Sequence, residues 1–253
     1  MFRTLKISTL AFILASLSLA SAAQTSPQTS LKNRVFFIGD STMATKNGYG
    51  DAICEWLKGS VECLNLAKNG RSSKSFREEG LWAQALLEMK NNPQQLNQWV
   101  LIQFGHNDQP GKPGRSTDLA TEYPKNLASY VLDARAQGAM PILVTPLSRR
   151  SFKNGELQHD LADWAASMKE VAIRLKVPLI DLNSMSRQKI IEVGEDQADR
   201  YAETPKGTPK FDRTHLGPLG ACVFGALVLN QLPVATNDSI QVTTDKNCEA
   251  AFK

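Results

Sequence analysis

The stretch VFFIGDSTMATKNGYG, residues 35–50, joins a short apolar run directly to a Gly-Asp-Ser triplet. Residues 35–38 are aromatic or β-branched and favour a strand, and Ser41 follows at its carboxyl end. Ligands of α/β proteins bind at that end of a parallel sheet. The alternative is an ordinary strand-to-helix turn, in which Asp40 and Ser41 cap the next helix. The rest of the chain decides between these two interpretations.

Short apolar runs alternate along the chain with longer amphipathic stretches. Two of these stretches, residues 118–138 and 157–176, place apolar residues three and four positions apart, which is typical of helices packed on a sheet. Such alternation predicts an α/β fold in which parallel strands are joined by helical crossovers. The predicted strands are residues 34–39, 61–67, 99–105, 140–146 and 177–183.

The N-terminal residues resemble a secretory signal peptide. A basic start with Arg3 and Lys6 precedes an apolar run that is too short for a membrane span, and small residues follow it. We therefore expect a signal peptide at 1–23, a leader at 24–32 and one domain at 33–253, exported to the periplasm or the medium. No membrane association is expected of the mature chain.

The charge balance argues against a nucleic-acid-binding protein. The formal net charge is +4 for the full sequence and +2 without Arg3 and Lys6. A dedicated nucleic-acid binder carries a much stronger basic surface. The same balance is compatible with an acidic polysaccharide as partner.

Four cysteines in an exported chain predict two disulfides. Their spacing does not match a zinc site, because no two of them form a close Cys-x-x-Cys pair. Three pairings are possible. We favour Cys54 with Cys63, which closes a short local loop, and Cys222 with Cys248, which ties the C-terminal tail, 233–253, to the last helix.

Three further segments carry polar residues where a strand ends or a helix begins. Gly70 lies in KNGRSS after the second strand, and Asn107 lies in the GHND sequence after the third. Asp212 and His215, three residues apart, precede the last apolar helix, so a carboxylate can orient an imidazole there. Each segment has a structural alternative, namely a plain turn, a loop, or a helix cap beside a surface histidine.

Taken together, the four segments resemble the signature blocks of the SGNH (GDSL-like) hydrolases. The fuller sequences GDSTMAT, NGRSSKSF and QFGHNDQ are similar to the rhamnogalacturonan acetylesterase branch, carbohydrate esterase family twelve. The resemblance covers residues 33–232. It implies a flavodoxin-like, three-layer α/β/α sandwich with a five-stranded parallel sheet and an esterase site at the carboxyl ends of the strands.

The resemblance also implies a role for each matching residue. Ser41 is expected to be the nucleophile, His215 the general base and acid, and Asp212 its orienting partner. The N–H groups of Ser41 and Gly70 and the side-chain amide of Asn107 are expected to form the oxyanion hole. This mechanism requires neither a metal nor an organic cofactor.

The expected substrate is an acetylated plant cell-wall polysaccharide, most simply rhamnogalacturonan, bound by a monomer. Acetylxylan, small esters, lipids and thioesters remain alternative substrates, and an inactive polysaccharide-binding protein is the non-enzymatic alternative. The candidate substrate-binding residues include basic residues that follow strand ends and two neighbours of Asn107. They are Arg71, Lys74, Arg149, Arg150, Lys153, His106 and Asp108.

Overall fold

A computed structural model describes Met1, residues 33–59 and 61–233, and Cys248. The predicted signal peptide and leader therefore lie outside the described residues, apart from Met1. Five strands form one parallel sheet in the order β2-β1-β3-β4-β7. They are β1 (Asn33–Gly39), β2 (Glu62–Asn65), β3 (Asn97–Gln103), β4 (Met140–Val144) and β7 (Leu179–Ile180).

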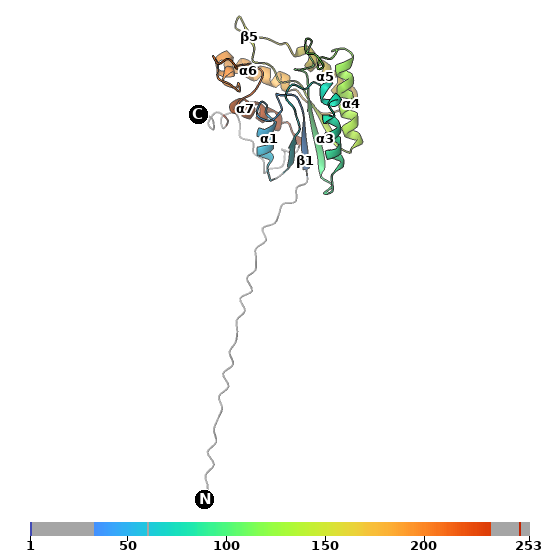
Figure 1. Cartoon of the computed structure of the whole chain (residues 1–253). Coiled ribbons are helices and arrows are strands. Elements are labelled where there is room, and N and C mark those ends of the chain that lie inside the picture. The colour runs from blue at the N-terminus through green and yellow to red at the C-terminus, as the bar shows by residue number, and fades with distance from the viewer. Residues whose placement is uncertain (2–32, 60, 234–247, 249–253) are drawn as a thin grey trace. The chain divides into compact units, whose positions relative to one another are not determined.

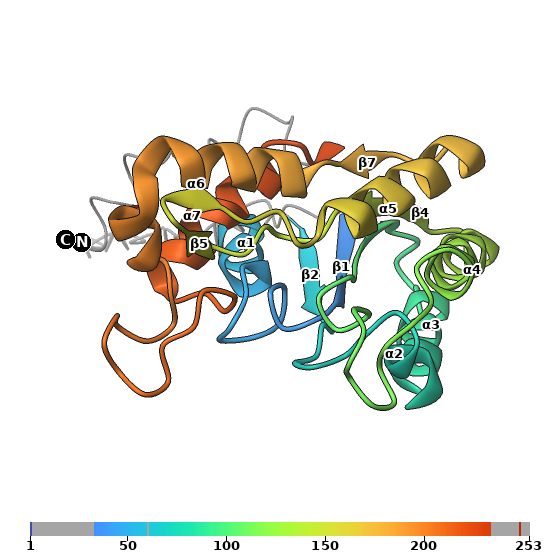
Figure 2. The same ribbon diagram turned by 90° about the horizontal axis from the view of Figure 1, so that it is seen from above.

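The strand order explains where a site can form. β1 pairs with β2 on one side and with β3 on the other, so the chain reverses its direction of winding at β1. The crevice outside such a reversal is where open parallel sheets bind ligands. Figure 2 shows that the loops after β1, β2 and β3 emerge on one side of the sheet.

Helices cover both faces of the sheet, which confirms the expected three-layer α/β/α architecture (Figure 1). The core of one face includes Phe37 and Leu101 with residues of α1, α6 and α7, and the other includes Phe36 and Ile102 with residues of α2 to α5. Because β1 is buried on both faces, it reads as a continuous apolar run. The helices are α1 (Gly50–Leu57), α2 (Ser75–Glu78), α3 (Leu81–Lys90), α4 (Glu122–Ala136), α5 (Ala162–Leu175), α6 (Leu182–Asp199) and α7 (Pro218–Leu229).

The fifth strand is shorter than the apolar run at 177–183 predicts. β7 ends at Ile180, and α6 begins two residues later. The Asp181 side chain ends the strand because it caps α6, accepting a hydrogen bond from the Ser184 N–H, and it also accepts one from the Thr145 hydroxyl. In the described part of the chain, no helix combines the length and apolar character needed to cross a membrane.

The loop at 146–156 contains the beginning of a small hairpin that the sequence did not reveal. Its strands, β5 (Phe152–Lys153) and β6 (Glu156–Leu157), pair in antiparallel fashion around Asn154 and Gly155, which both have positive φ. Asn and Gly are the residues that adopt this backbone conformation most readily. Two residues per strand are too few for an alternating pattern to be recognised in the sequence.

Both expected disulfides are present. Cys54 pairs with Cys63, and Cys222 pairs with Cys248. The first joins α1 to β2, and the second connects α7 to Cys248. The pairing of Cys248 therefore confirms the expected covalent tie, although residues 234–247 lie outside the described part of the chain.

Candidate active site

Ser41 lies at the carboxyl end of β1, in a turn that the neighbouring sequence holds tightly. The Asp40 carboxylate accepts hydrogen bonds from the Thr42 N–H (2.9 Å) and hydroxyl (2.8 Å). A Cβ atom at Gly48 would lie 2.4 Å from the Thr42 carbonyl, so this position requires glycine. The turn is therefore held by the Asp40 side chain and by the close packing of Gly48 against the Thr42 carbonyl.

His215 and Asp212 meet Ser41 from the loop before α7. The His215 Nε2 lies 2.9 Å from the Ser41 Oγ, and the His215 Nδ1 lies 3.0 Å from the Asp212 Oδ2. Ser41 comes from a segment 174 residues away in the sequence. The three side chains thus form a continuous row that can pass a proton from the serine hydroxyl to the imidazole.

The surroundings of Asp212 keep its carboxylate ionised. Partial burial by itself raises the pKa of Asp212, but the N–H groups of His215 and Thr214, each 2.7 Å from Oδ1, and the His215 ring outweigh it. The pKa of Asp212 is consequently held below its usual value. An ionised carboxylate at Nδ1 favours the tautomer in which the His215 Nε2 accepts a proton.

Arg150 does not bind substrate as the sequence suggested, because its side chain is fully buried. Its guanidinium donates hydrogen bonds to the backbone carbonyls of the loop, at 2.7 Å from the His215 oxygen and 3.4 Å from the Asp212 oxygen. Its own N–H donates to the Arg213 carbonyl at 2.9 Å. Arg150 therefore fixes the loop that carries the imidazole and its carboxylate.

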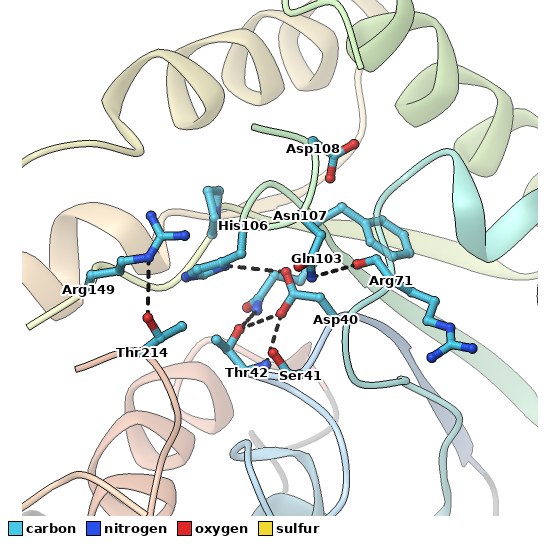
Figure 3. Close-up of polar contacts among 12 residues, drawn as sticks. Asp40, Ser41, Thr42, Arg71, Gln103, His106, Asn107, Asp108, Arg149 and Thr214 are labelled. Atoms are coloured by element: carbon cyan, nitrogen blue, oxygen red, sulfur yellow. Dashed lines mark hydrogen bonds and ion pairs between the residues drawn. The ribbon is translucent and has the colours of Figure 1, made fainter. Parts of the chain in front are cut away.

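The three expected oxyanion donors are present on neighbouring loops. Gly70 has φ +78°, a conformation that favours glycine. Asn107 follows β3, and its Nδ2 donates to the Arg71 carbonyl at 3.1 Å, which leaves its second N–H for another acceptor (Figure 3). Within the described residues, the N–H groups of Ser41 and Gly70 donate to no protein acceptor. The oxyanion role of these groups stays a prediction.

A buried chain of polar side chains behind Ser41 was missed in the sequence. The Tyr49 hydroxyl donates to the Gln103 Oε1 (2.5 Å), the Gln103 Nε2 to the Thr42 hydroxyl (2.6 Å), and Thr42 to Asp40. All four side chains are fully buried. The sequence signal for this buried chain was Tyr49 between two glycines. A Cβ atom at Gly50 would lie 2.4 Å from the Met43 oxygen, so glycine lets the backbone beside Tyr49 pack closely against the turn.

His106 also belongs to this buried layer. It is 2% exposed, and its Nδ1 lies 3.3 Å from the Asp40 Oδ2 (Figure 3). Burial raises the pKa of Asp40, but His106 and then Thr42 outweigh that effect and keep the pKa below its usual value. The contact that the structure shows for His106 is with the Asp40 turn, and its expected contact with substrate stays a prediction.

Asp108 is likewise buried, contrary to the expectation that it binds substrate. Its carboxylate accepts hydrogen bonds from the Ser73 N–H (3.0 Å) and hydroxyl (2.5 Å) and from the Thr117 hydroxyl (3.2 Å). These contacts join the Gly70 loop to the Asn107 loop. Burial raises the pKa of Asp108 to about 7, although these hydrogen bonds act in the opposite direction.

The raised pKa of Asp108 predicts a specific dependence of stability on pH. Between about pH 4 and pH 7, the folded protein keeps a proton that the unfolded chain has released, so this contribution falls as the pH rises. We expect Asp108→Asn, which mimics the protonated carboxyl, to flatten the dependence by several kcal/mol across that window. Urea unfolding of both proteins at pH 4.5 and 7.5 measures it. Equal pH dependence in parent and variant would show that Asp108 is ionised throughout.

Arg71 and Arg149 remain at the rim of the site. The Arg71 guanidinium is partly exposed and pairs with Glu79 at 2.7 Å. Arg149 donates to the Thr214 hydroxyl at 3.3 Å and pairs with Asp160, so its guanidinium lies beside the loop that carries His215 (Figure 3). The cationic groups of both residues flank the row of Ser41 and His215 and stay candidates for contact with substrate.

The fold and the site together define a serine hydrolase of the three-layer α/β/α class. The GDSL-like Lipase/Acylhydrolase family matches residues 37–221, and the chain belongs to that family. Over 220 residues it is 34% identical to a Bacillus subtilis protein named "Probable rhamnogalacturonan acetylesterase YesY", covering 83% of this chain and 98% of the relative. It is 40% identical over 237 residues to the rhamnogalacturonan acetylesterase of Emericella nidulans, covering 84% and 91%.

Among solved structures, a variant of Axe2, an acetyl-xylooligosaccharide esterase from Geobacillus, superposes with a TM-score of 0.62. The match covers 85% of this chain and 100% of that chain at 16% identity, so it supports the fold alone. The family and the named relatives confirm that the protein is an esterase and place it among the carbohydrate esterases. The resemblance found in the four sequence blocks is thereby confirmed.

Proposed function

We propose that this protein is an exported serine esterase that removes acetyl groups from rhamnogalacturonan. The observation that carries the proposal is the hydrogen-bonded row of Ser41, His215 and Asp212 in a chain 34% to 40% identical to named rhamnogalacturonan acetylesterases. The row supplies the chemistry of ester hydrolysis, and the relatives indicate the polysaccharide.

The geometry supports a two-step mechanism. The Ser41 Oγ attacks the acetyl carbonyl carbon while the His215 Nε2 takes the hydroxyl proton, and the sugar hydroxyl leaves with that proton. Water then attacks the acetyl-serine, again giving a proton to His215, which returns it to Ser41 as acetic acid departs. The N–H groups of Ser41, Gly70 and Asn107 stabilise the negative oxygen in both tetrahedral intermediates.

A polar hollow beside the nucleophile turn supports a carbohydrate substrate. Its volume is about 370 Å³, and it lies between the segment that follows Ser41 and the segment that contains Gly70. A lining of polar side chains with a few apolar ones suits a sugar better than a long acyl chain, which requires an apolar tunnel. The hollow is lined by Ala44, Thr45, Ala67, Lys68, Asn69, Arg71 and Leu81.

A parallel set of substrates tests the proposal. Acetate release from acetylated rhamnogalacturonan, acetylated xylan and acetylated mannan is compared at equal acetyl content, together with 4-nitrophenyl esters from acetyl to decanoyl. We expect the highest kcat/KM on rhamnogalacturonan, the polysaccharide in the names of the relatives, and a steep loss beyond butanoyl, because a site adapted to an acetyl group has little room for a long acyl chain. Equal or faster release from xylan would replace the pectic substrate, and a preference for octanoyl esters would indicate a lipolytic enzyme.

The same set decides the non-enzymatic alternative. A polysaccharide-binding protein would retain rhamnogalacturonan in a pull-down experiment but would release no acetate from any ester. The contacts between Ser41, His215 and Asp212 argue against it, because a binding module has no need of a base at a serine hydroxyl.

Export is proposed from the N-terminal sequence alone, since residues 2–32 lie outside the described part of the chain. The pattern of a basic start, an apolar run and small residues predicts cleavage before Gln24. N-terminal sequencing of the protein recovered from periplasm or medium measures this directly. Recovery of the chain only from the cytoplasm, with Met1 or Phe2 at its start, would contradict export.

A further inference from the structure

Lys112 contacts the oxyanion-hole asparagine, and neither the family resemblance nor the proposed mechanism uses it. Its Nζ donates to the His106 carbonyl at 2.5 Å and lies 3.5 Å from the Asn107 Oδ1. Within the described residues, no carboxylate lies within ion-pair distance of this ammonium group. The ammonium group therefore lies against the His106 carbonyl and close to the acceptor side of the Asn107 amide, without a carboxylate partner in the described part of the chain.

The loop that carries Lys112 is built to hold it in place. The Lys112 N–H donates to the Ser116 hydroxyl at 2.8 Å, and the N–H groups of Arg115 and Ser116 return to the Lys112 carbonyl at 3.0 and 2.9 Å. The Ser116 hydroxyl also donates to the Gln109 carbonyl. Because these bonds already fix the Lys112 backbone, only its side chain remains to be ordered when the ammonium group makes a defined contact.

The contacts of Asn107 show what such a charge does. One side of the amide faces an acceptor, because Nδ2 donates to the Arg71 carbonyl, and the other faces the Lys112 ammonium. If the amide were turned by 180°, its oxygen would face the Arg71 carbonyl and its N–H groups would face a cation. Both contacts would be repulsive. The two neighbours thus fix one orientation, in which a second Nδ2–H remains for the oxyanion.

We propose that Lys112 is a positioning residue of the oxyanion hole, which orients the Asn107 amide and polarises it toward the developing negative oxygen. A cation at the carbonyl end of an amide makes its N–H groups stronger donors, and this matters most when the acceptor is an oxyanion. The inference rests on the proposed role of Asn107 but not on the identity of the polysaccharide. It therefore applies to every ester that the enzyme hydrolyses.

The surroundings of Lys112 give this proposal a measurable pH dependence. Burial first, and then the positive charges of Arg149 and Arg115, lower the pKa of the Lys112 ammonium, while Asp40 and Asp108 raise it. Its charge should therefore be lost at a lower pH than that of an exposed lysine. An arginine at the same position would keep its charge throughout the range in which the enzyme can be assayed.

The test compares Lys112→Met, Lys112→Gln and Lys112→Arg on 4-nitrophenyl acetate, with Lys125→Met on the exposed surface of α4 as the matched control. We expect kcat to fall about 10- to 100-fold in the first two variants, while KM changes less than about threefold. This loss of kcat is smaller than the loss expected when an oxyanion donor itself is deleted. Lys112→Arg should restore most of kcat and keep it at alkaline pH, where the activity of the parent declines. Thermal unfolding verifies that each variant is folded.

A double-mutant cycle with Asn107→Ala separates the possible outcomes. If Lys112 acts through Asn107, Lys112→Met has no further effect in the Asn107→Ala background. An equal loss in both backgrounds would overturn the proposal, as would an unchanged kcat in Lys112→Met. A raised KM on rhamnogalacturonan alone would also overturn it and assign Lys112 to substrate binding. If Asn107→Ala itself is fully active, the oxyanion role of Asn107 fails instead.

Discussion

Replacing Ser41 with alanine is expected to reduce acetyl-ester hydrolysis by about 10⁴- to 10⁶-fold, the scale of nucleophile deletions in serine hydrolases. The change removes the Oγ that lies 2.9 Å from the His215 Nε2 and leaves the backbone N–H of the same residue in place. The oxyanion donors therefore remain, and the residual rate should still exceed the reaction in water. Initial rates of acetate release from the preferred polysaccharide measure the effect.

Two comparisons make this result specific. Ser129→Ala, on α4, removes a hydroxyl that donates to the Lys125 carbonyl on the same helix, and it should retain the parent rate. His215→Ala should lose about as much activity as Ser41→Ala, and combining the two should add little, because they act as one unit. Near-parental activity of Ser41→Ala would show that another group is the nucleophile.

Replacing Asp212 with asparagine is expected to lower kcat by about 10³- to 10⁴-fold while the protein remains folded. The asparagine oxygen can still accept the two N–H groups that reach the Asp212 Oδ1. Its NH₂ group, however, would face the His215 Nδ1 and favour the tautomer with a proton on Nε2. That tautomer cannot accept the Ser41 proton. Steady-state kinetics with a thermal unfolding curve measure both parts of the prediction.

Asp163→Asn, an exposed position on α5, is the matched change of a carboxylate to an amide and should leave kcat unaltered. Parental activity in Asp212→Asn would mean that a different carboxylate orients His215. Asp108 is the other motif carboxylate that could orient the histidine. It is buried on another loop, however, and accepts hydrogen bonds from Ser73 and Thr117. The structure thus leaves Asp212 as the partner that contacts the imidazole.

Much of the fold followed from hydrophobic patterning alone. The run 35–38 and its four counterparts mark buried parallel strands because both faces of the sheet are covered, and this is a strong signal. The exact ends of the elements were less predictable. The run 177–183 looks like one strand, yet the capping hydrogen bond at Asp181 begins a helix in its middle. A local polar contact decided the boundary there, and hydrophobicity carries no information about it.

The site could be predicted in part because reactive residues sit at strand ends. Ser41, Gly70 and Asn107 follow β1, β2 and β3, so the topology brings them together. Burial was not predictable, because His106, Asp108 and Arg150 have the composition of exposed loops but face inward. Each of these side chains makes polar contacts with residues distant in the sequence, as His106 does with Asp40. Such pairing emerges only when the loops are placed in three dimensions.

Covalent labelling with a 4-nitrophenyl phosphonate ester tests the central claim most directly. The reagent forms an adduct that mimics the tetrahedral intermediate, and it reacts fastest with a serine that is activated by a base and placed beside oxyanion donors. Peptide mass spectrometry of the labelled protein is expected to find one phosphonate, on Ser41, with stoichiometric loss of esterase activity and no labelling in His215→Ala. Absence of an adduct under conditions that label a control serine esterase, or an adduct on a different residue, would contradict the account.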